Sequence, residues 1–273
     1  MTYAVLGPIG TFSEEAVRIY SQSNSHIWVT ENISDLFELV EKGQVSDGLV
    51  PLENSATGII SITMECLAAS TLKIKGTIEI PIKQYLLANG NYKPKEIQLL
   101  ISQKVALEQC RRYINKNLKG VRTEITESTA RAAQLVREET RRAAAIGSRR
   151  LARLYGLKII EAAVQDGINY TRFIHIAANS SDAVKGNNSS LILSLPHKVG
   201  ALYNLLEVFT RFKLNLQKIE SFPAESPGNY IFYIEVEKEE EDINMELLLH
   251  ELRPYSNWVK YLGSYTQRRI IEC

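Results

Sequence analysis

A change of pattern after residue 178 is the feature that most constrains the fold of this chain. Over residues 2–178, short apolar runs alternate with amphipathic helical segments. A polar stretch follows over residues 179–190, and a different order of strands and helices begins at Leu191. At 273 residues the chain is also too long for one ordinary core. We therefore predict two domains, 1–178 and 191–268, joined by a linker at 179–190.

The first region has the alternation that is typical of an α/β fold with a largely parallel sheet. Thr11 and Glu14 form a capping-box pattern at the start of its first helix. Strands are predicted over residues 3–6, 48–52, 97–101, 143–146 and 158–164, and helices over 12–20, 34–41, 105–117, 129–141 and 148–155.

The second region follows the order strand, helix, strand, strand, helix, strand. Its strands are predicted over residues 191–195, 215–222, 230–237 and 258–262, and its helices over 200–213 and 245–252. This βαββαβ order is that of a ferredoxin-like module. An exposed edge on such a sheet invites pairing with a second copy, so we expect a homodimer or homotetramer.

Composition and targeting signals exclude several classes of protein. The 32 Lys and Arg residues and 31 Asp and Glu residues leave a net charge of +1, which gives no reason to expect nucleic acid as a partner. No basic and apolar leader opens the sequence, and no apolar run approaches the roughly 20 residues that span a bilayer. We therefore expect a cytoplasmic protein without a membrane partner. Three distant cysteines suit reduced thiols, and no Cys and His spacing suggests a metal site.

Three polar turns follow apolar strands of the first region, at residues 7–13, 53–58 and 126–130. In α/β sheets, ligands bind beyond the carboxyl ends of the strands, where helix N-termini offer free amide groups to anions. Capping of the following helices by Thr11, Ser13, Ser128 and Thr129 is the alternative explanation of these residues. Their recurrence at one expected edge of the sheet favours a carboxylate site.

Six segments resemble those of one enzyme family. Residues 7–13 (GPIGTFS), 50–58 (VPLENSATG), 127–133 (ESTARAA) and 169–173 (NYTRF) resemble, in order, the signature segments of prephenate dehydratase. Residues 200–202 (GAL) and 219–223 (IESFP) resemble the ligand-binding segments of the family's C-terminal ACT domain. The resemblance covers nearly the whole chain. It implies a catalytic domain similar to a type 2 periplasmic binding protein, with the active site between two α/β lobes.

The resemblance implies the conversion of prephenate to phenylpyruvate, CO₂ and water, in the biosynthesis of L-phenylalanine. No redox step occurs, so no cofactor is expected. The family's essential threonine falls at Thr171, which could act as a proton donor or as an oriented hydrogen-bond donor. Arg172 is a second catalytic candidate that could clamp a substrate carboxylate. A structural ion pair remains open for Arg172, since strand alternation turns it away from Thr171.

Other residues of these segments are candidates for orienting the substrate. A carboxylate beside a dianionic substrate would repel it, so Glu53 is expected to serve structure through a buried hydrogen bond. The substrate-binding candidates are Ser13, Asn54, Ser55, Thr129 and Asn169.

The ACT resemblance implies that L-phenylalanine binds and regulates the enzyme. The effector-binding candidates, contributed by two subunits, are Gly200, Ala201, Leu202, Asn215, Glu220 and Ser221. Val199 and Phe222 stand where the family commonly has proline and arginine, and Gln103-Lys104 replaces a common His-Pro pair. We therefore expect an unusual affinity for phenylalanine.

Two other functions stay open at this point. An arogenate dehydratase runs the same elimination on the amino analogue of prephenate. A non-catalytic amino-acid sensor would combine a solute-binding-like domain with an ACT module, although the Thr171-Arg172-Phe173 run favours an enzyme. We expect a monofunctional protein, because no segment of the sequence resembles a chorismate mutase.

Overall fold

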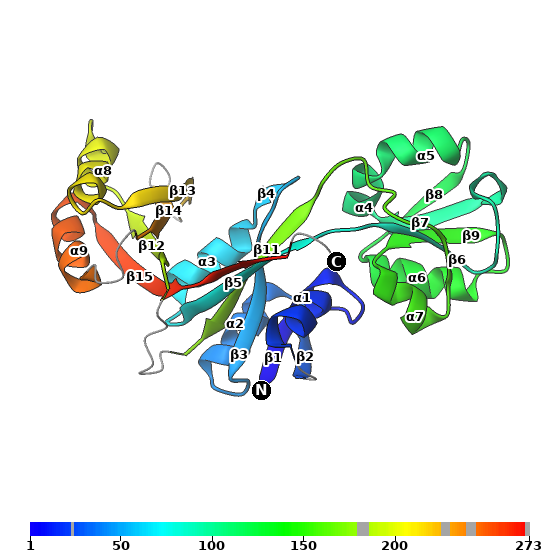
Figure 1. The fold of residues 1–273 in the computed structure, drawn as a ribbon, viewed down its shortest axis with the longest axis horizontal. Helices are drawn as coiled ribbons and strands as arrows, with labels where there is room; N and C mark the ends of the chain where they lie inside the picture. Colours follow the sequence, from blue (N-terminus) through cyan, green and yellow to red (C-terminus); the bar gives the residue numbers. More distant parts are fainter. Residues whose placement is uncertain (23–24, 179–185, 225–229, 239–243, 271–273) are drawn as a thin grey trace.

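The computed structural model describes residues 1–22, 25–178, 186–224, 230–238 and 244–270. Three bodies lie in a row, each built around its own sheet (Figure 1). We call them the first lobe, the second lobe and the C-terminal sheet. None of the helices in these ranges is long and apolar enough to span a membrane.

The first lobe lies in the middle of the row and contains the N-terminus (Figure 1). Its sheet has the order β16-β5-β11-β3-β1-β2, and the short β4 pairs with β3. Helix α1 covers one face, while α2 and α3 cover the other. The strands are β1 (Thr2–Leu6), β2 (His26–Thr30), β3 (Asp47–Asn54), β4 (Gly58–Ile59), β5 (Lys73–Pro81), β11 (Tyr170–Ala177) and β16 (Gln267–Arg269), and the helices are α1 (Phe12–Ser21), α2 (Ile33–Glu41) and α3 (Ser61–Ala69).

The second lobe has a sheet of order β10-β6-β9-β7-β8. Helices α6 and α7 pack on one face, and α4 and α5 pack on the other. The strands are β6 (Tyr85–Ala88), β7 (Leu99–Gln103), β8 (Arg122–Thr126), β9 (Ala143–Gly147) and β10 (Lys158–Glu161), and the helices are α4 (Lys104–Gln109), α5 (Arg111–Asn117), α6 (Thr129–Glu138), α7 (Arg149–Tyr155) and the 3₁₀ turn η1 (Pro94–Glu96).

The prediction of largely parallel sheets is wrong, because both lobes contain mixed sheets. In the first lobe β11 runs antiparallel to β3 and β5, and in the second lobe β6 runs antiparallel to β9 and β10. The chain crosses between the lobes twice, through residues 82–84 and 162–169. Strand β6 enters the second lobe from the first crossing, and β11 enters the first lobe from the second crossing. Each therefore starts at the cleft and runs antiparallel to neighbouring strands that end there.

Two local predictions also need correction. The predicted helix over residues 105–117 is broken at Cys110 into α4 and α5. The Asp166 carboxylate accepts hydrogen bonds from the backbone N–H groups of Arg112 (2.8 Å) and Tyr113 (3.2 Å). It thereby caps the start of α5. The capping box at α1 does not form, since the Thr11 hydroxyl makes no cap. Glu14 is occupied by other partners instead.

The C-terminal sheet confirms the predicted βαββαβ order, with strands arranged β13-β14-β12-β15. One face is covered by α8 and α9, and the other shares a core with α3 of the first lobe. Strand β12 begins at Asn188, so the last residues of the predicted linker belong to it, while 179–185 lie outside the described residues. The elements are β12 (Asn188–Ser194), α8 (Ala201–Arg211), β13 (Asn215–Pro223), β14 (Tyr230–Glu237), α9 (Met245–Leu252), the 3₁₀ turn η2 (Arg253–Tyr255) and β15 (Trp258–Tyr265).

Candidate active site

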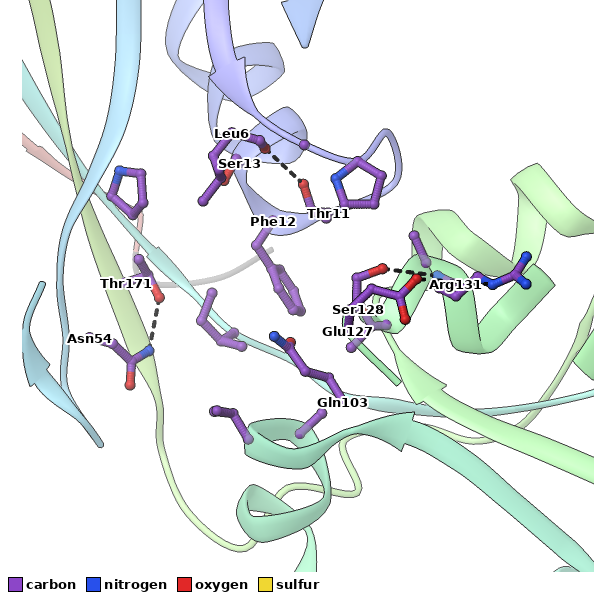
Figure 2. A pocket seen from close by; sticks show the side chains of 18 of the residues that line it. Leu6, Thr11, Phe12, Ser13, Asn54, Gln103, Glu127, Ser128, Arg131 and Thr171 are labelled. Carbon is purple, nitrogen blue, oxygen red and sulfur yellow. Dashed lines mark hydrogen bonds and ion pairs between the residues drawn. The ribbon is translucent and has the colours of Figure 1, made fainter. Parts of the chain in front are cut away.

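A cavity of about 1020 Å³ lies between the two lobes. In the first lobe, the start of α1, the end of β3 and the start of β11 line this cavity. In the second lobe, α4 and the start of α6 line it. Figure 2 shows Thr171 and Asn54 on one side and Glu127 and Ser128 on the other, with Phe12 extending between them. The three polar turns predicted from the sequence therefore meet at one site.

Thr171 is the hydroxyl at the centre of the first-lobe wall. Its side chain is buried yet lines the cavity, and Asn54 Nδ2 donates a hydrogen bond of 2.9 Å to its Oγ1 (Figure 2). The two residues are register partners in the β3–β11 ladder. Because the amide donates, the Thr171 hydroxyl hydrogen remains free to point at a ligand.

Asn54 is itself held from both ends of its side chain. Its Oδ1 accepts from the backbone N–H groups of Ala56 (3.0 Å) and Thr57 (3.2 Å), which closes an Asx-type turn. Its Nδ2 also donates to Asn169 Oδ1 at 2.9 Å, and Ser55 Oγ donates to the same oxygen at 3.2 Å. Asn54 is therefore fixed in the orientation that serves Thr171.

Ser55 and Asn169 do not line the cavity, in contrast to their prediction as substrate-binding residues. Ser55 accepts a hydrogen bond from the Tyr170 backbone N–H at 2.9 Å, and Asn169 is buried behind Asn54. Ser55 and Asn169 hydrogen-bond to each other, and Asn169 also accepts from Asn54. They therefore hold Asn54 in place rather than face the cavity.

The starts of helices α1 and α6 approach the cavity from opposite lobes. Ser13 and Thr129 lie in their first turns, line the cavity and make no hydrogen bond to other side chains or to the backbone in the described part of the chain. Ser128 does cap α6, since its side chain accepts from the Arg131 N–H at 3.1 Å. Free amide groups and hydroxyls at two helix starts suit two separate carboxylates.

Four glutamines, Gln84, Gln103, Gln109 and Gln134, complete the polar lining, and none of them was predicted as a site residue. Gln84 lies on the first crossing, and its Nε2 donates to Gln109 Oε1 at 3.0 Å, while Gln103 ends β7. Gln84 is almost fully buried at 3 % exposure. For Gln103, a polar residue at the end of an apolar strand was the available sequence signal.

The charged lining is sparse. Glu31, Glu127 and Arg131 line the cavity, and the Arg131 guanidinium points away from Thr171 (Figure 2). Arg131 Nε lies 4.0 Å from a Glu127 carboxylate oxygen. Among the described residues, no three His, Cys, Asp or Glu side chains are grouped to hold a metal ion.

Arg172 does not reach this cavity, which corrects its prediction as a catalytic residue. Strand alternation turns its buried guanidinium to the opposite face of β11, where Nη1 donates to Glu235 Oε2 of the C-terminal sheet at 2.7 Å. The ion-pair alternative is the one observed. Glu53 also faces that side and accepts from Lys218 Nζ at 2.5 Å, an interdomain ion pair rather than the predicted buried bond.

A cluster around Glu14 joins the two lobes beside the cavity. Glu14 Oε2 accepts from the Gly10 N–H (2.7 Å) and from Arg150 Nε of the second lobe (2.9 Å), and Oε1 accepts from Arg18. Ser148 Oγ adds a bond of 2.8 Å to the Gly10 carbonyl. Gly10 itself has φ of +93°, and a Cβ there would lie 2.5 Å from Leu151, so only glycine fits this contact.

Replacement of Glu14 by glutamine is expected to lower the free energy of unfolding at pH 7 by about 2 kcal/mol, because hydrogen bonds to charged groups are lost. Burial alone would raise the pKa of Glu14, but hydrogen bonds from Arg150, Arg18 and Gly10 outweigh it and hold that pKa below its ordinary value. A lowered folded pKa gives stability that is present above the unfolded pKa near 4 and lost as the pH falls through the folded value.

Urea unfolding at pH 7 and pH 3 measures this effect. The difference between wild type and Glu14→Gln should be large at pH 7 and shrink at pH 3. Glu38→Gln is the matched control, since Glu38 forms an exposed helical pair with Lys42 and should change stability by less than about 0.5 kcal/mol. Equal stabilities of Glu14→Gln and wild type at pH 7 would contradict the interpretation.

The predicted effector-binding residues are only partly brought together within one chain. Gly200 has φ of +78° and forms the N-cap of α8, followed by Ala201 and Leu202. Asn215 pairs with Glu237 and Ser221 with Phe232, so they lie near opposite ends of the β13–β14 ladder. The site as predicted requires Asn215 to come from a second copy.

The two departures from the family pattern that lie in the C-terminal region occupy contrasting positions. Val199 is fully exposed just before α8, whereas Phe222 is buried in the core shared with the first lobe. Glu220 lies 3.4 Å from Lys218. Phe222 therefore stabilises the contact between the C-terminal sheet and the first lobe.

Comparison with known proteins agrees with this geometry. The sequence profile described as prephenate dehydratase matches residues 3–181. The chain belongs to this family. A prephenate dehydratase of Methanocaldococcus jannaschii is 35 % identical over 94 % of this chain and 95 % of its own length.

Solved structures of similar proteins extend the match to the whole fold. A prephenate dehydratase from Arthrobacter aurescens in complex with L-Phe has a TM-score of 0.86 and 27 % identity, covering 97 % of this chain and 90 % of its own. GqqA, described as a novel type of quorum-quenching acylase, has a TM-score of 0.85 and 25 % identity, covering 97 % of both chains. The two-lobed α/β fold expected of a prephenate dehydratase is thereby confirmed.

Proposed function

We propose that this prephenate dehydratase converts prephenate to phenylpyruvate, CO₂ and water, with Thr171 assisting the departure of the ring hydroxyl. The observation that carries the proposal is the Thr171 hydroxyl, held by Asn54 from behind and open to the cavity in front. The experiment that tests it is the turnover of a Thr171→Ala variant.

The reaction requires one proton and no redox partner. The bond between the ring and its carboxylate breaks to release CO₂, and its electron pair enters the ring as the ring C–O bond breaks. The departing hydroxyl takes a proton and leaves as water. The Thr171 hydroxyl supports this step as a general acid or as an oriented hydrogen-bond donor, and the same geometry serves both.

Substrate recognition rests on the two helix starts. Ser13 on α1 and Thr129 on α6 offer hydroxyls and backbone amides from opposite lobes. One carboxylate at each helix start would place the ring between the lobes, near Phe12 and Thr171. Helix dipoles favour such anions by about 0.3–1 kcal/mol each at exposed sites, so no free cation is needed.

An acylase activity like that of GqqA is less well supported by this cavity. Acyl transfer through a nucleophile needs an adjacent base that takes its proton. Among the described residues that line the cavity there is no His or Lys, and Glu127 lies across the cavity from Thr171 (Figure 2). An acylase assay on the purified chain, with release of a carboxylic acid from an N-acyl amide, is the direct check, and we expect no hydrolysis.

Arogenate is the remaining alternative substrate. Its ammonium replaces the keto oxygen of prephenate, so it carries a net charge of −1 rather than −2. Side-by-side rates on the two compounds distinguish the enzymes, and we propose that prephenate is preferred. A higher kcat/KM for arogenate than for prephenate would overturn that preference.

We further propose that residues 1–178, together with the returning strand β16, are the catalytic domain and that residues 188–265, close to the predicted 191–268, form an ACT domain that binds L-phenylalanine as a homo-oligomer. The support comes from the ferredoxin-like order of β12–β15, the positive φ of Gly200 at the start of α8, and the exposed edge strand β13. The free thiols of Cys66 and Cys110 suit the proposed cytoplasmic location.

L-Phenylalanine is expected to raise the melting temperature of the protein, because a ligand that binds only the folded state stabilises it by about 2.7 kcal/mol at a hundredfold excess over Kd. Calorimetry gives the affinity, and L-alanine is the matched control ligand. Absence of both binding heat and a thermal shift with L-phenylalanine would contradict the proposed effector.

A further inference from the structure

The β3–β11 ladder carries side chains of two kinds on its two faces. Asn54 pairs with Thr171, and Glu53 pairs with Arg172. Since neighbouring side chains of a strand point to opposite faces, Asn54 and Thr171 face the cavity. Glu53 and Arg172 face the C-terminal sheet. We call the cavity side of the ladder its front and the opposite side its back. Each back residue, Glu53 or Arg172, is therefore adjacent in sequence to a front residue, Asn54 or Thr171.

The C-terminal sheet supplies an opposite charge to each residue at the back. Arg172 Nη1 donates to Glu235 Oε2 on β14 at 2.7 Å, and Glu53 accepts from Lys218 Nζ on β13 at 2.5 Å. Arg172 and Glu53 also lie 3.5 Å apart. We call these four residues the charge cluster. It joins two strands of the first lobe to two strands of the C-terminal sheet.

Glu235 is the most firmly held member of the charge cluster. It is 5 % exposed, and its Oε1 accepts from the Tyr233 hydroxyl at 2.6 Å and from the Tyr265 hydroxyl at 3.4 Å. Ser190 lies within hydrogen-bond distance of both tyrosine hydroxyls. Burial and the Glu235 charge raise the pKa of Tyr233 well above its ordinary value, so its hydroxyl stays a donor.

Arg172, in contrast, makes one short contact, to Glu235 at 2.7 Å, while its Nη2 lies 3.5 Å from Glu53. Its Nε and Nη2 atoms are buried without a hydrogen-bond partner. The bond from Nη1 to Glu235 is thus the one hydrogen bond of this guanidinium in the described part of the chain. The backbone of β11 is paired with β3 and β5 at this residue, and this one bond ties the Arg172 guanidinium to the C-terminal sheet.

We propose that Glu235 is a positioning residue for the reaction, which holds Arg172 at the back of β11 and thereby fixes the direction of the Thr171 hydroxyl at the front. The inference rests on the proposed role of Thr171. A misplacement of about 1 Å at a reacting group can lower a rate by roughly 10²-fold. Glu235 touches no substrate, so its loss should affect turnover and leave substrate binding at the helix starts unchanged.

The test compares Glu235→Gln with Glu237→Gln in steady-state assays with prephenate. Glu237 lies on the same strand and is exposed, so it is a matched control that should behave as wild type. For Glu235→Gln we expect kcat to fall at least about tenfold, with KM changed less than about twofold. Circular dichroism confirms folding at the assay temperature.

A double-mutant cycle with Arg172→Met tests whether Glu235 acts through Arg172. Each single variant should lower kcat, and the double variant should lower it by much less than the product of the two effects. Should Glu235→Gln fail to fold, Tyr233→Phe keeps the carboxylate and removes one of its hydrogen bonds, and a smaller fall in kcat at constant KM is expected.

The outcomes separate this inference from the proposed function. An active wild type with a folded Glu235→Gln variant that turns over at the wild-type rate overturns the inference alone, as does a fully multiplicative cycle. A wild type that forms no phenylpyruvate overturns the proposed function itself.

Discussion

Replacement of Thr171 by alanine is expected to lower kcat for phenylpyruvate formation by about 10²- to 10⁴-fold, the range that a positioned acid contributes. The hydroxyl is the group that Asn54 orients toward the cavity, and no other described hydroxyl in the cavity wall accepts a hydrogen bond from a side-chain amide. KM should change little, because the proposed carboxylate sites are at the starts of α1 and α6, away from the Thr171 hydroxyl.

Thr171→Ser is the matched control for this prediction. Serine keeps the hydroxyl and loses only a methyl group, so its kcat should stay within about tenfold of wild type and well above that of alanine. Both variants are followed by the alkaline absorbance of phenylpyruvate, with thermal melting as a check on folding. Near-wild-type turnover of a folded Thr171→Ala protein would remove Thr171 from the mechanism.

Asn54→Asp is expected to lower kcat by about 10- to 100-fold, the second largest effect on activity, by analogy with the loss of one oriented donor. The carboxylate still accepts from Ala56 and Thr57 and so preserves the turn. It cannot donate to Thr171 or Asn169. The Thr171 hydroxyl would then donate backward to residue 54 and no longer toward the ligand.

Asn54→Ala gives the comparison that separates the two roles of this side chain. Alanine removes the turn as well as the donor, so the protein should also lose about 1–2 kcal/mol of stability. The aspartate variant should match wild type more closely in stability than in kcat. An aspartate variant with normal kcat would show that the Asn54 donor is not needed.

The order of the elements was predictable from the sequence, because hydrophobic periodicity is a local signal. The βαββαβ order of residues 188–265 and the strands β1, β3, β7, β9 and β10 of the two lobes were found in this way, whereas β2, β5, β6, β8 and helix α3 were not predicted. Strand direction was not, since the antiparallel placement of β6 and β11 depends on where the chain crosses between lobes. The break at Cys110 depends on Asp166, 56 residues further along the chain.

The site was predictable to a similar degree. Polar residues after apolar runs indicated Ser13, Asn54 and Thr129, and the polar start of an apolar strand indicated Thr171; all four line one cavity. Support and partner residues could not be assigned, because their contacts are set by tertiary packing. Arg172 shows this clearly, since its partner Glu235 lies 63 residues away in the C-terminal sheet.

The most direct test of the central claim is incubation of the purified protein with prephenate, followed by the alkaline absorbance of phenylpyruvate, beside Thr171→Ala at equal concentration. We predict rapid phenylpyruvate formation by wild type and a rate lower by about 10²-fold or more for the variant. No phenylpyruvate from folded wild type, or equal rates from the two proteins, would contradict the account.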